Sequence, residues 1–195
     1  MGDHKARKFD LHSVVNDVLE SIESDEMEVI GGGHSAKCVV VRSALYGHIL
    51  VVKAYYQETE QYLCDTELNM YNHLAHLQGD IIPLLLGTAH SNFAGSDCRM
   101  LIMSYGGIPL HQCTANDELI INLTKCAIAL RSNGVLLADS RMDNVLVNGN
   151  KVTVIDLESA YLIDQSSASI RNFESEIEEL ALEVKKSGDL EALLP

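Results

Sequence analysis

Two aspartates and an asparagine stand around a segment that is predicted to form a β-hairpin. Asp139 and Asn144 precede one β-branched run and Asp156 follows a second, with Asn148-Gly149 between the runs. An Asn-Gly pair tolerates positive φ, so it is suited to the tight turn of a hairpin. Two carboxylates and an amide brought together by such a hairpin provide hard oxygen ligands for Mg²⁺ and one further base. These are the groups that phosphoryl transfer requires.

A glycine-rich segment and a strand that contains a single lysine come earlier in the chain. Residues 30–38 read Ile-Gly-Gly-Gly-His-Ser-Ala-Lys-Cys, and residues 49–54 are apolar except for Lys53. A glycine triplet alone most often marks a turn, and a lone lysine among aliphatic residues often lies on an edge strand and reaches solvent. A lysine inside a buried strand instead requires an anionic partner.

The next segment, residues 58–77, is predicted to form a helix whose apolar face contains one carboxylate. That face is formed by Leu63, Glu67, Met70, Leu74 and Leu77. A buried acid and a buried base are tolerated best as a pair, so Glu67 is the predicted partner of Lys53. Glu60 is the alternative, because it begins a second, less apolar stripe through Cys64 and Tyr71.

These segments, in this order, resemble the motifs of the protein-kinase-like superfamily. Residues 31–38 fit the glycine-loop pattern G-x-G-x-x-G-x-V, with Ala36 for the third glycine and Cys38 for the valine. The hairpin segment fits D-x-x-x-x-N followed by a metal-binding aspartate. The resemblance covers residues 27–160, about two-thirds of the chain.

The resemblance implies a role for each matched residue. Asp139 would orient the acceptor hydroxyl and take its proton, and Arg141 would touch phosphate. Asn144 and Asp156 would hold Mg²⁺, and Lys53, paired with Glu67, would contact the phosphates of ATP. The remaining nucleotide contacts would come from Gly31, Gly33, Ala36, Cys38, Met103, Ser104, Tyr105 and Gly106.

The fold implied is α+β with two lobes in a single domain, residues 1–195. An amino-terminal extension, residues 1–26, contains an amphipathic helix over residues 9–23. An N-lobe, residues 27–104, has five antiparallel strands and one helix, and residues 105–195 form the hinge and a reduced, mainly helical C-lobe. Met103 would be the gatekeeper and residues 104–106 would bind adenine, although an edge strand that runs into a glycine turn explains this segment equally well.

The C-lobe is predicted to begin with a helix capped by Thr114 with Asp117, and to end that helix at Asn133-Gly134. The predicted buried stripe of this helix is Ile120, Leu123, Ala127 and Leu130.

Several positions depart from the superfamily pattern. Leu137 and Ala138 replace the His-Arg pair before the catalytic aspartate, so switching by loop phosphorylation is not expected. Leu157-Glu158 replaces Phe-Gly, which retains apolar packing and adds charge near the metal. Only 39 residues follow Asp156, without an A-P-E motif. They include a predicted helix with one apolar face, formed by Ile170, Phe173, Ile177, Leu180 and Val184.

Composition narrows the class of protein. The formal charge of −14 disfavours nucleic-acid partners, no apolar run is long enough to span a membrane, and five scattered cysteines are typical of reduced intracellular thiols. We therefore expect an intracellular, cytoplasmic monomer. The leading hypothesis is a phosphotransferase that uses ATP and Mg²⁺ to phosphorylate a hydroxyl acceptor. The alternative is a pseudokinase that binds nucleotide or a protein partner without phosphotransfer.

Overall fold

The computed structural model describes residues 15–20, 27–32, 36–42, 48–56, 61–93, 96–114, 116–138 and 141–163. The chain divides into two compact units. The first contains residues 1–61 and 85–105, and the second contains residues 62–84 and 106–195. Strand pairing between the named strands is antiparallel in every sheet, and helices accompany the sheets, so the fold is α+β.

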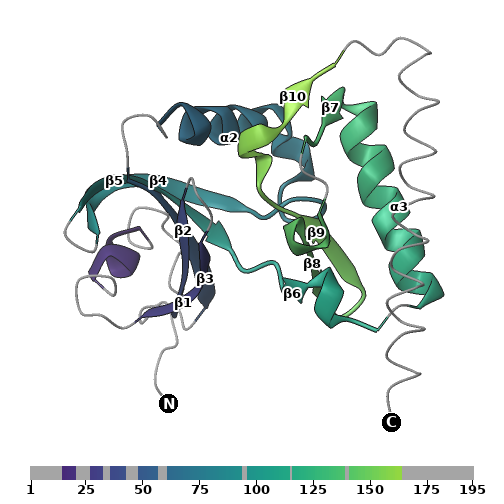
Figure 1. Ribbon diagram of the computed structural model, residues 1–195, viewed down its shortest axis with the longest axis horizontal. Coiled ribbons are helices and arrows are strands. Elements are labelled where there is room, and N and C mark those ends of the chain that lie inside the picture. The colour runs from purple at the N-terminus through teal and green to yellow at the C-terminus, as the bar shows by residue number, and fades with distance from the viewer. Residues whose placement is uncertain are drawn as a thin grey trace, which may run out of the picture. The chain divides into compact units, whose positions relative to one another are not determined.

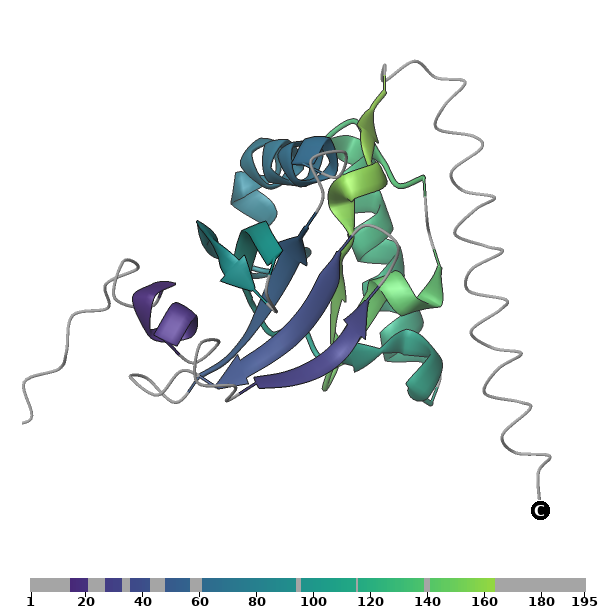
Figure 2. The same cartoon turned by 60° about the vertical axis from the view of Figure 1, so that its left-hand side comes forward.

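The first unit is built on a five-stranded sheet in the order β1-β2-β3-β5-β4 (Figure 2). Its strands are β1 (Met27–Gly32), β2 (Lys37–Arg42), β3 (Ile49–Tyr55), β4 (Leu85–Phe93) and β5 (Ser96–Ser104). The sequence predicts all five.

One face of this sheet packs against a short helical segment, residues 15–20. Val18 of that segment is fully buried and belongs to a cluster with Val39, Val41, Leu50, Val52, Ala54, Leu86, Cys98, Met100 and Ile102. Alternate residues of β2, β3 and β5 supply most of the cluster, because side chains of a strand point to opposite faces in turn. The sequence predicted an amphipathic helix over residues 9–23, and residues 15–20, the part that the structure describes, are helical.

Among its described residues, the second unit contains two helices and two small sheets (Figure 1). Its helices are α2 (Gln61–His73) and α3 (Asp117–Ser132). One sheet joins β6 (Ile108–Pro109), β8 (Val145–Asn148) and β9 (Lys151–Val154), and the other joins β7 (Val135–Leu136) and β10 (Tyr161–Leu162). Short 3₁₀ turns connect them: η2 (Ala75–Leu77), η3 (Leu110–Gln112), η4 (Met142–Asn144) and η5 (Leu157–Ser159).

Helix α3 packs on the β8–β9 hairpin. The thiol of Cys126 donates a hydrogen bond to the carbonyl of Val152, with 3.4 Å between S and O, and the side-chain amide of Asn122 donates to the carbonyl of Asn150 at 2.6 Å. Burial raises the pKa of the Cys126 thiol to about 11, and the nearby carboxylate of Asp80 adds to the shift. The hairpin is thus fixed to a helix that is distant from it in sequence.

Three details differ from the sequence predictions. The N-cap of α3 is Asn116, whose side chain accepts a hydrogen bond from the backbone N–H of Leu119 at 2.8 Å, instead of Thr114. The buried face of α3 is Leu119, Leu123, Cys126 and Leu130, a stripe rotated from the predicted one. The hairpin turn is centred on Gly149-Asn150, because Asn148 pairs with Lys151.

The end of α3 and the buried face of α2 were anticipated more closely. Helix α3 ends at Ser132, with Asn133 as C-cap and Gly134 at φ 70°, as the Asn-Gly pair predicted. In α2 and the turn after it, both predicted stripes contribute buried residues, namely Cys64, Glu67, Met70, Tyr71 and Leu74. Within the described ranges no helix is long and apolar enough to cross a membrane.

Candidate functional site

Lys53 lies in the central strand of the first unit's sheet and is 7% exposed. Its neighbours across the sheet are Cys38 in β2 and Leu101 in β5. A bulge after Val29 in β1 places Gly31 opposite Cys38. Gly31, Cys38 and Lys53, three of the predicted nucleotide contacts, therefore form one row across β1, β2 and β3.

The pairing of β3 with β5 also places the residues that were predicted to form the hinge. Met103 is opposite Val51, two residues from Lys53 along β3, so its side chain is on the same face as Lys53. Ser104 closes β5, and Tyr105 and Gly106 follow it. The two compact units meet in sequence between Tyr105 and Gly106. The lysine ammonium also lies 5.3 Å from the ring centroid of Tyr55, a distance at which a cation and an aromatic ring attract.

The hairpin of the second unit brings Asn144 and Asp156 to the same end, as predicted. Val145 pairs with Val154, and one step farther the backbone N–H of Ile155 donates to the carbonyl of Asn144 at 2.9 Å. Asn144 itself is 7% exposed and closes η4, where its N–H donates to the carbonyl of Arg141. The buried amide of Asn144 and the carboxylate of Asp156 thus belong to residues at the same end of the hairpin, just outside β8 and β9.

Asp156 has a left-handed backbone conformation, with φ 66° and ψ 55°, and is the one non-glycine residue with positive φ in the described ranges. Aspartate is among the few residues that tolerate this conformation, which often occurs at functional sites. The chain then makes the turn η5, in which Leu157 is fully buried and Ala160 donates to the carbonyl of Leu157. Leu157 anchors the turn, as its apolar type predicted, with Asp156 and Glu158 on either side of it.

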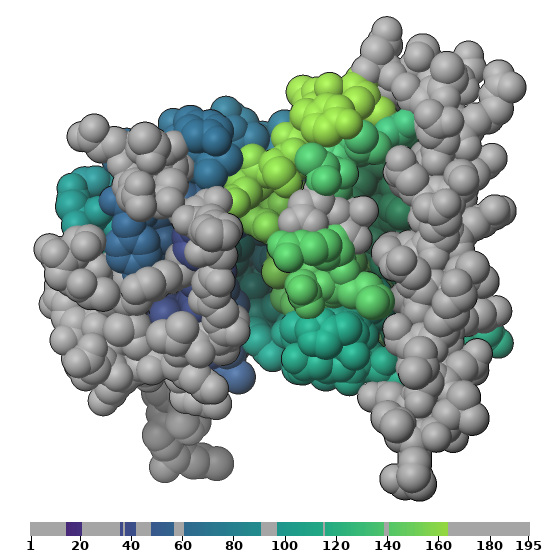
Figure 3. All heavy atoms as spheres, in the orientation of Figure 1, coloured from purple at the N-terminus to yellow at the C-terminus, as the bar shows by residue number. Residues whose placement is uncertain are grey.

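Three carboxylates of the second unit come together at this turn. Glu67 of α2, Asp156 and Glu158 each offer an oxygen, and these oxygens lie within 4.8 Å of one another. The space-filling view shows the yellow-green atoms of the segment after residue 155 bordering the blue atoms of α2 (Figure 3). Glu67 is 1% exposed, whereas Asp156 and Glu158 are half-buried. We refer to Glu67, Asp156 and Glu158 as the carboxylate cluster.

The donor set and spacing of the carboxylate cluster fit a hard divalent cation. Like charges this close repel one another unless positive charge is placed among them. Ligands on opposite sides of Mg²⁺ are about 4.2 Å apart, and those on opposite sides of Ca²⁺ are about 4.6–5.2 Å apart. Oxygens that lie within 4.8 Å of one another are therefore within reach of one Ca²⁺, and Mg²⁺ would need them no more than about 4.2 Å apart. All three donors are carboxylate oxygens, which both ions prefer.

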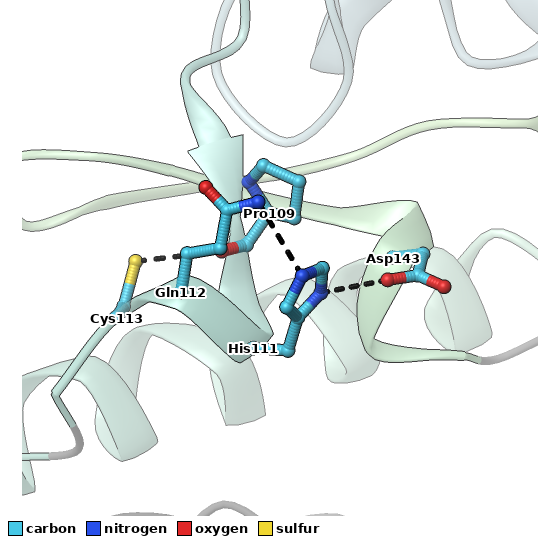
Figure 4. Close-up of polar contacts among 5 residues, drawn as sticks. All are labelled: Pro109, His111, Gln112, Cys113 and Asp143. Atoms are coloured by element: carbon cyan, nitrogen blue, oxygen red, sulfur yellow. Dashed lines mark hydrogen bonds and ion pairs between the residues drawn. The ribbon is translucent and has the colours of Figure 1, made fainter. Parts of the chain in front are cut away.

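A second polar pair lies in the same unit, between η3 and η4. His111 Nδ1 is 2.7 Å from the Asp143 carboxylate, and the side-chain nitrogen of Gln112 is 3.4 Å from His111 Nε2 (Figure 4). The two side chains of the pair are 43% and 57% exposed. Nearby, the Cys113 thiol donates to the carbonyl of Pro109, and burial raises its pKa. This arrangement connects η3 to the turn that contains Asn144.

The structure brings some of the predicted site residues together and does not test the others. Asn144 and Asp156 share one end of the hairpin, and the carboxylates of Glu67 and Glu158 lie with that of Asp156 in the carboxylate cluster. Lys53 and Glu67 belong to different units, so their pairing stays a prediction. Asp139, Gly33 and Glu60 are outside the described residues. Arg141 is exposed, and Ala36 is 7% exposed before β2.

Sequence reasoning assigned no role to His111 and Asp143, and it named Glu158 only as added charge. His111 and Asp143 are 32 residues apart, and no local pattern brings them together. Glu158 immediately follows the buried Leu157, and an acidic residue two positions after the aspartate that was predicted to bind metal was the available signal. The sequence matches no model of a known protein family, and a comparison with curated proteins finds no significant match.

Proposed function

We propose that this protein is a kinase-like phosphotransferase that uses ATP and Mg²⁺ to phosphorylate a hydroxyl acceptor. The observation that carries the proposal is the carboxylate cluster, which lies at the end of a hairpin whose other strand begins beside the buried Asn144. Hard oxygen donors and an amide in this arrangement suit a metal ion that binds phosphate.

The first unit supports the proposal through the row Gly31, Cys38 and Lys53. A glycine in this row leaves room for a phosphate to approach the backbone, and the lysine supplies positive charge in a chain with a formal charge of −14. Met103, on the same face as Lys53, would contact the base, and the backbone of residues 104–106 would hydrogen-bond to it. The two-lobe, kinase-like arrangement of the units is part of this proposal.

In the second unit Asp156 would hold the metal, with Glu158 or Asn144 as a further ligand. When bound, Mg²⁺ would neutralise charge that develops on the transferred phosphoryl group. Asp139 would orient the acceptor hydroxyl and accept its proton, and Arg141 would contact phosphate. Glu67, buried in α2, would either pair with Lys53 or act as a further carboxylate ligand of the metal.

Thermal stabilisation by Mg²⁺-ATP tests the proposal that this protein binds the nucleotide. Mg²⁺-ATP at about 100 times its dissociation constant should stabilise the protein by about 2.7 kcal/mol. Lys53→Met keeps the apolar stem in the sheet and should remove the ATP-dependent part, whereas Asp156→Asn should remove the metal-dependent part. No shift in melting temperature with millimolar Mg²⁺-ATP would show that the protein does not bind this nucleotide.

A second candidate is a module that binds metal or nucleotide without transfer. Glu158 favours it, because a third carboxylate in the cluster repels an approaching phosphate unless enough cations are bound. Transfer of labelled phosphate to the protein, to peptides and to small hydroxyl compounds separates the two candidates. Transfer that is at least about 100-fold slower in Asp139→Asn supports the enzyme, because general base catalysis contributes about that much. Nucleotide binding without any transfer supports the module.

A further inference from the structure

A histidine and an aspartate of the second unit form an exposed pair whose contacts define which ring nitrogen carries the proton. His111 Nδ1 lies 2.7 Å from a carboxylate oxygen of Asp143, and the side-chain nitrogen of Gln112 lies 3.4 Å from His111 Nε2 (Figure 4). An ionised carboxylate only accepts hydrogen bonds, so Nδ1 carries the proton. An amide nitrogen only donates, so Nε2 carries a lone pair. His111 is therefore neutral, with its unprotonated nitrogen on the side of the ring away from Asp143.

The unprotonated Nε2 of His111 has the features of an activated nucleophile. A carboxylate on the other ring nitrogen makes the imidazole more basic, and it stabilises the positive charge that the ring acquires when Nε2 forms a new bond. The side chains of His111 and Asp143 are 43% and 57% exposed, so a reactant can reach the ring. Gln112 is exposed as well, and its contact of 3.4 Å is long for a hydrogen bond, so it is lost at little cost.

Two other roles of such a pair fit its surroundings less well. A metal site needs at least three protein ligands, and among the residues that the structure describes no third histidine, cysteine or carboxylate lies close enough to His111 and Asp143 to complete one. A purely structural role is limited, because an exposed pair of this kind contributes only about 0.2–1 kcal/mol. The orientation of the ring by Asp143 is thus better explained by chemistry at Nε2.

The pair and the carboxylate cluster are attached to the same end of the β8–β9 hairpin. Asp143 precedes Asn144 in η4, and the carbonyl of Asn144 accepts a hydrogen bond from the N–H of Ile155, the residue before Asp156. Arg141, which is exposed, stands at the start of the same turn and brings positive charge to it. Phosphate chemistry at the carboxylate cluster would therefore take place in the same part of the second unit as His111.

We propose that His111 Nε2 accepts a phosphoryl group, so that the protein carries a phosphohistidine. The donor is Mg²⁺-ATP, and in this respect the proposal rests on the proposed function. The lone pair of Nε2 attacks the γ-phosphorus, the bond from that phosphorus to the oxygen that bridges it to the β-phosphate breaks, and the electron pair of that bond leaves with ADP. The Nδ1 proton stays on the ring, hydrogen-bonded to Asp143, so this acceptor needs no general base. Gln112 then donates to an oxygen of the phosphoryl group.

Phosphoramidate, which transfers its phosphoryl group to histidine as ammonia leaves, tests the reactivity of His111 in the full chain without ATP. His90 provides the matched control, because it forms an exposed pair with Asp97 in which 3.6 Å between Nε2 and the carboxylate is too long for a hydrogen bond. His111 should be phosphorylated at least about tenfold faster than His90, and Asp143→Asn should remove most of that difference. Mass spectrometry of peptides kept at alkaline pH locates the group. Equal rates at the two histidines, or a difference that survives Asp143→Asn, would overturn the proposal.

Incubation with labelled Mg²⁺-ATP tests the donor. The full chain should gain a phosphoryl group that is labile in acid and stable in alkali, as expected for phosphate bonded to a histidine nitrogen. His111→Gln should lose this label and His90→Gln should keep it. A shift in melting temperature with Mg²⁺-ATP but no label on His111, or an acid-labile label that remains in His111→Gln, would overturn the proposal. No shift in melting temperature would overturn ATP as the donor together with the proposed function, so the two failures are distinguishable.

Discussion

The two units hold their polar groups in different ways. In the first unit Lys53 occupies the middle of a regular strand that is paired on both sides over at least six positions. In the second, Asp156 stands at a left-handed backbone position after a four-residue strand, and it meets a glutamate from a distant helix. Strand register alone is enough to place the lysine, whereas the carboxylates depend on a turn, a buried anchor and a long-range contact.

This difference indicates which substitutions should destabilise the second unit most. Its sheets consist of strands of two to four residues, so few backbone hydrogen bonds hold each one. The remaining stability of these sheets must come from two sources, namely close contacts between backbone segments and buried apolar side chains. Substitutions at those points should disturb the carboxylate cluster, while the sheet of the first unit should tolerate comparable changes.

The largest effect is expected at Gly107. Its φ is 121°, and an added Cβ would lie 2.1 Å from the carbonyl oxygen of Val147 in β8. Gly107→Ala should therefore lower the free energy of unfolding by about 3 kcal/mol or more, from backbone strain and steric overlap together. Urea denaturation measures the loss.

Gly149 provides the matched control within the same sheet. It also has positive φ, 62°, but nothing lies within 4 Å of an added Cβ. Gly149→Ala should cost only about 1 kcal/mol, from the left-handed conformation alone. Equal losses for the two variants would contradict the claim that a close backbone approach holds β6 on the hairpin.

The next largest effect is expected at alkaline pH, where the two units should lose stability over different pH ranges. Burial raises the pKa of Cys126 in the second unit from 9.0 to about 11, and that of Tyr56 in the first from 10.0 to about 12. Both groups are neutral when protonated, so the unfolded chain ionises first and the folded state loses stability as pH rises. The free energy of unfolding that is lost through ionisation of Cys126 should be lost between about pH 9 and 11. The loss through ionisation of Tyr56 should occur between about pH 10 and 12.

Denaturation at a series of pH values checks this order. Cys126→Ser should flatten the decline in unfolding free energy between pH 9 and 10, whereas Tyr56→Phe should leave that interval unchanged. A decline of the same slope in Cys126→Ser would mean that another group controls the alkaline stability of the second unit.

The smallest effect is expected for His111 and Asp143. Both side chains are about half exposed, and pairs of this kind contribute about 0.2–1 kcal/mol. A double-mutant cycle with His111→Ala and Asp143→Ala should give a coupling energy in this range that decreases with added salt. A coupling energy above about 2 kcal/mol would make the pair a major support of η4, in contrast to the buried anchors.

The sequence predicted the regular parts of this protein well. A continuous apolar run with a single lysine located β3, and the Asn-Gly pair located the end of α3, because each signal is local. The hairpin and the shared end for Asn144 and Asp156 followed from two β-branched runs and a turn. These features depend on neighbours in the sequence.

The remaining features depend on packing between distant segments. Two-residue strands such as β6 and β10 contain too few residues for a periodic signal. The N-cap of α3 is Asn116 and not Thr114, and the stripe of α3 that is buried contains Leu119 and Cys126 instead of Ile120 and Ala127. The meeting of Glu67 with Glu158 depends on how α2 and η5 pack in the second unit, and no pattern within either segment predicts it.

Titration of the full chain with Mn²⁺ or Mg²⁺ in the absence of nucleotide tests the carboxylate cluster most directly. Asp156→Asn keeps a residue that tolerates positive φ and removes one charge, and Asp143→Asn changes a nearby aspartate outside the cluster. We predict one site per chain that Asp156→Asn or Glu158→Gln weakens at least about tenfold and that Asp143→Asn leaves unchanged. Equal affinity in the wild type and Asp156→Asn would contradict the assignment of a metal site to Glu67, Asp156 and Glu158.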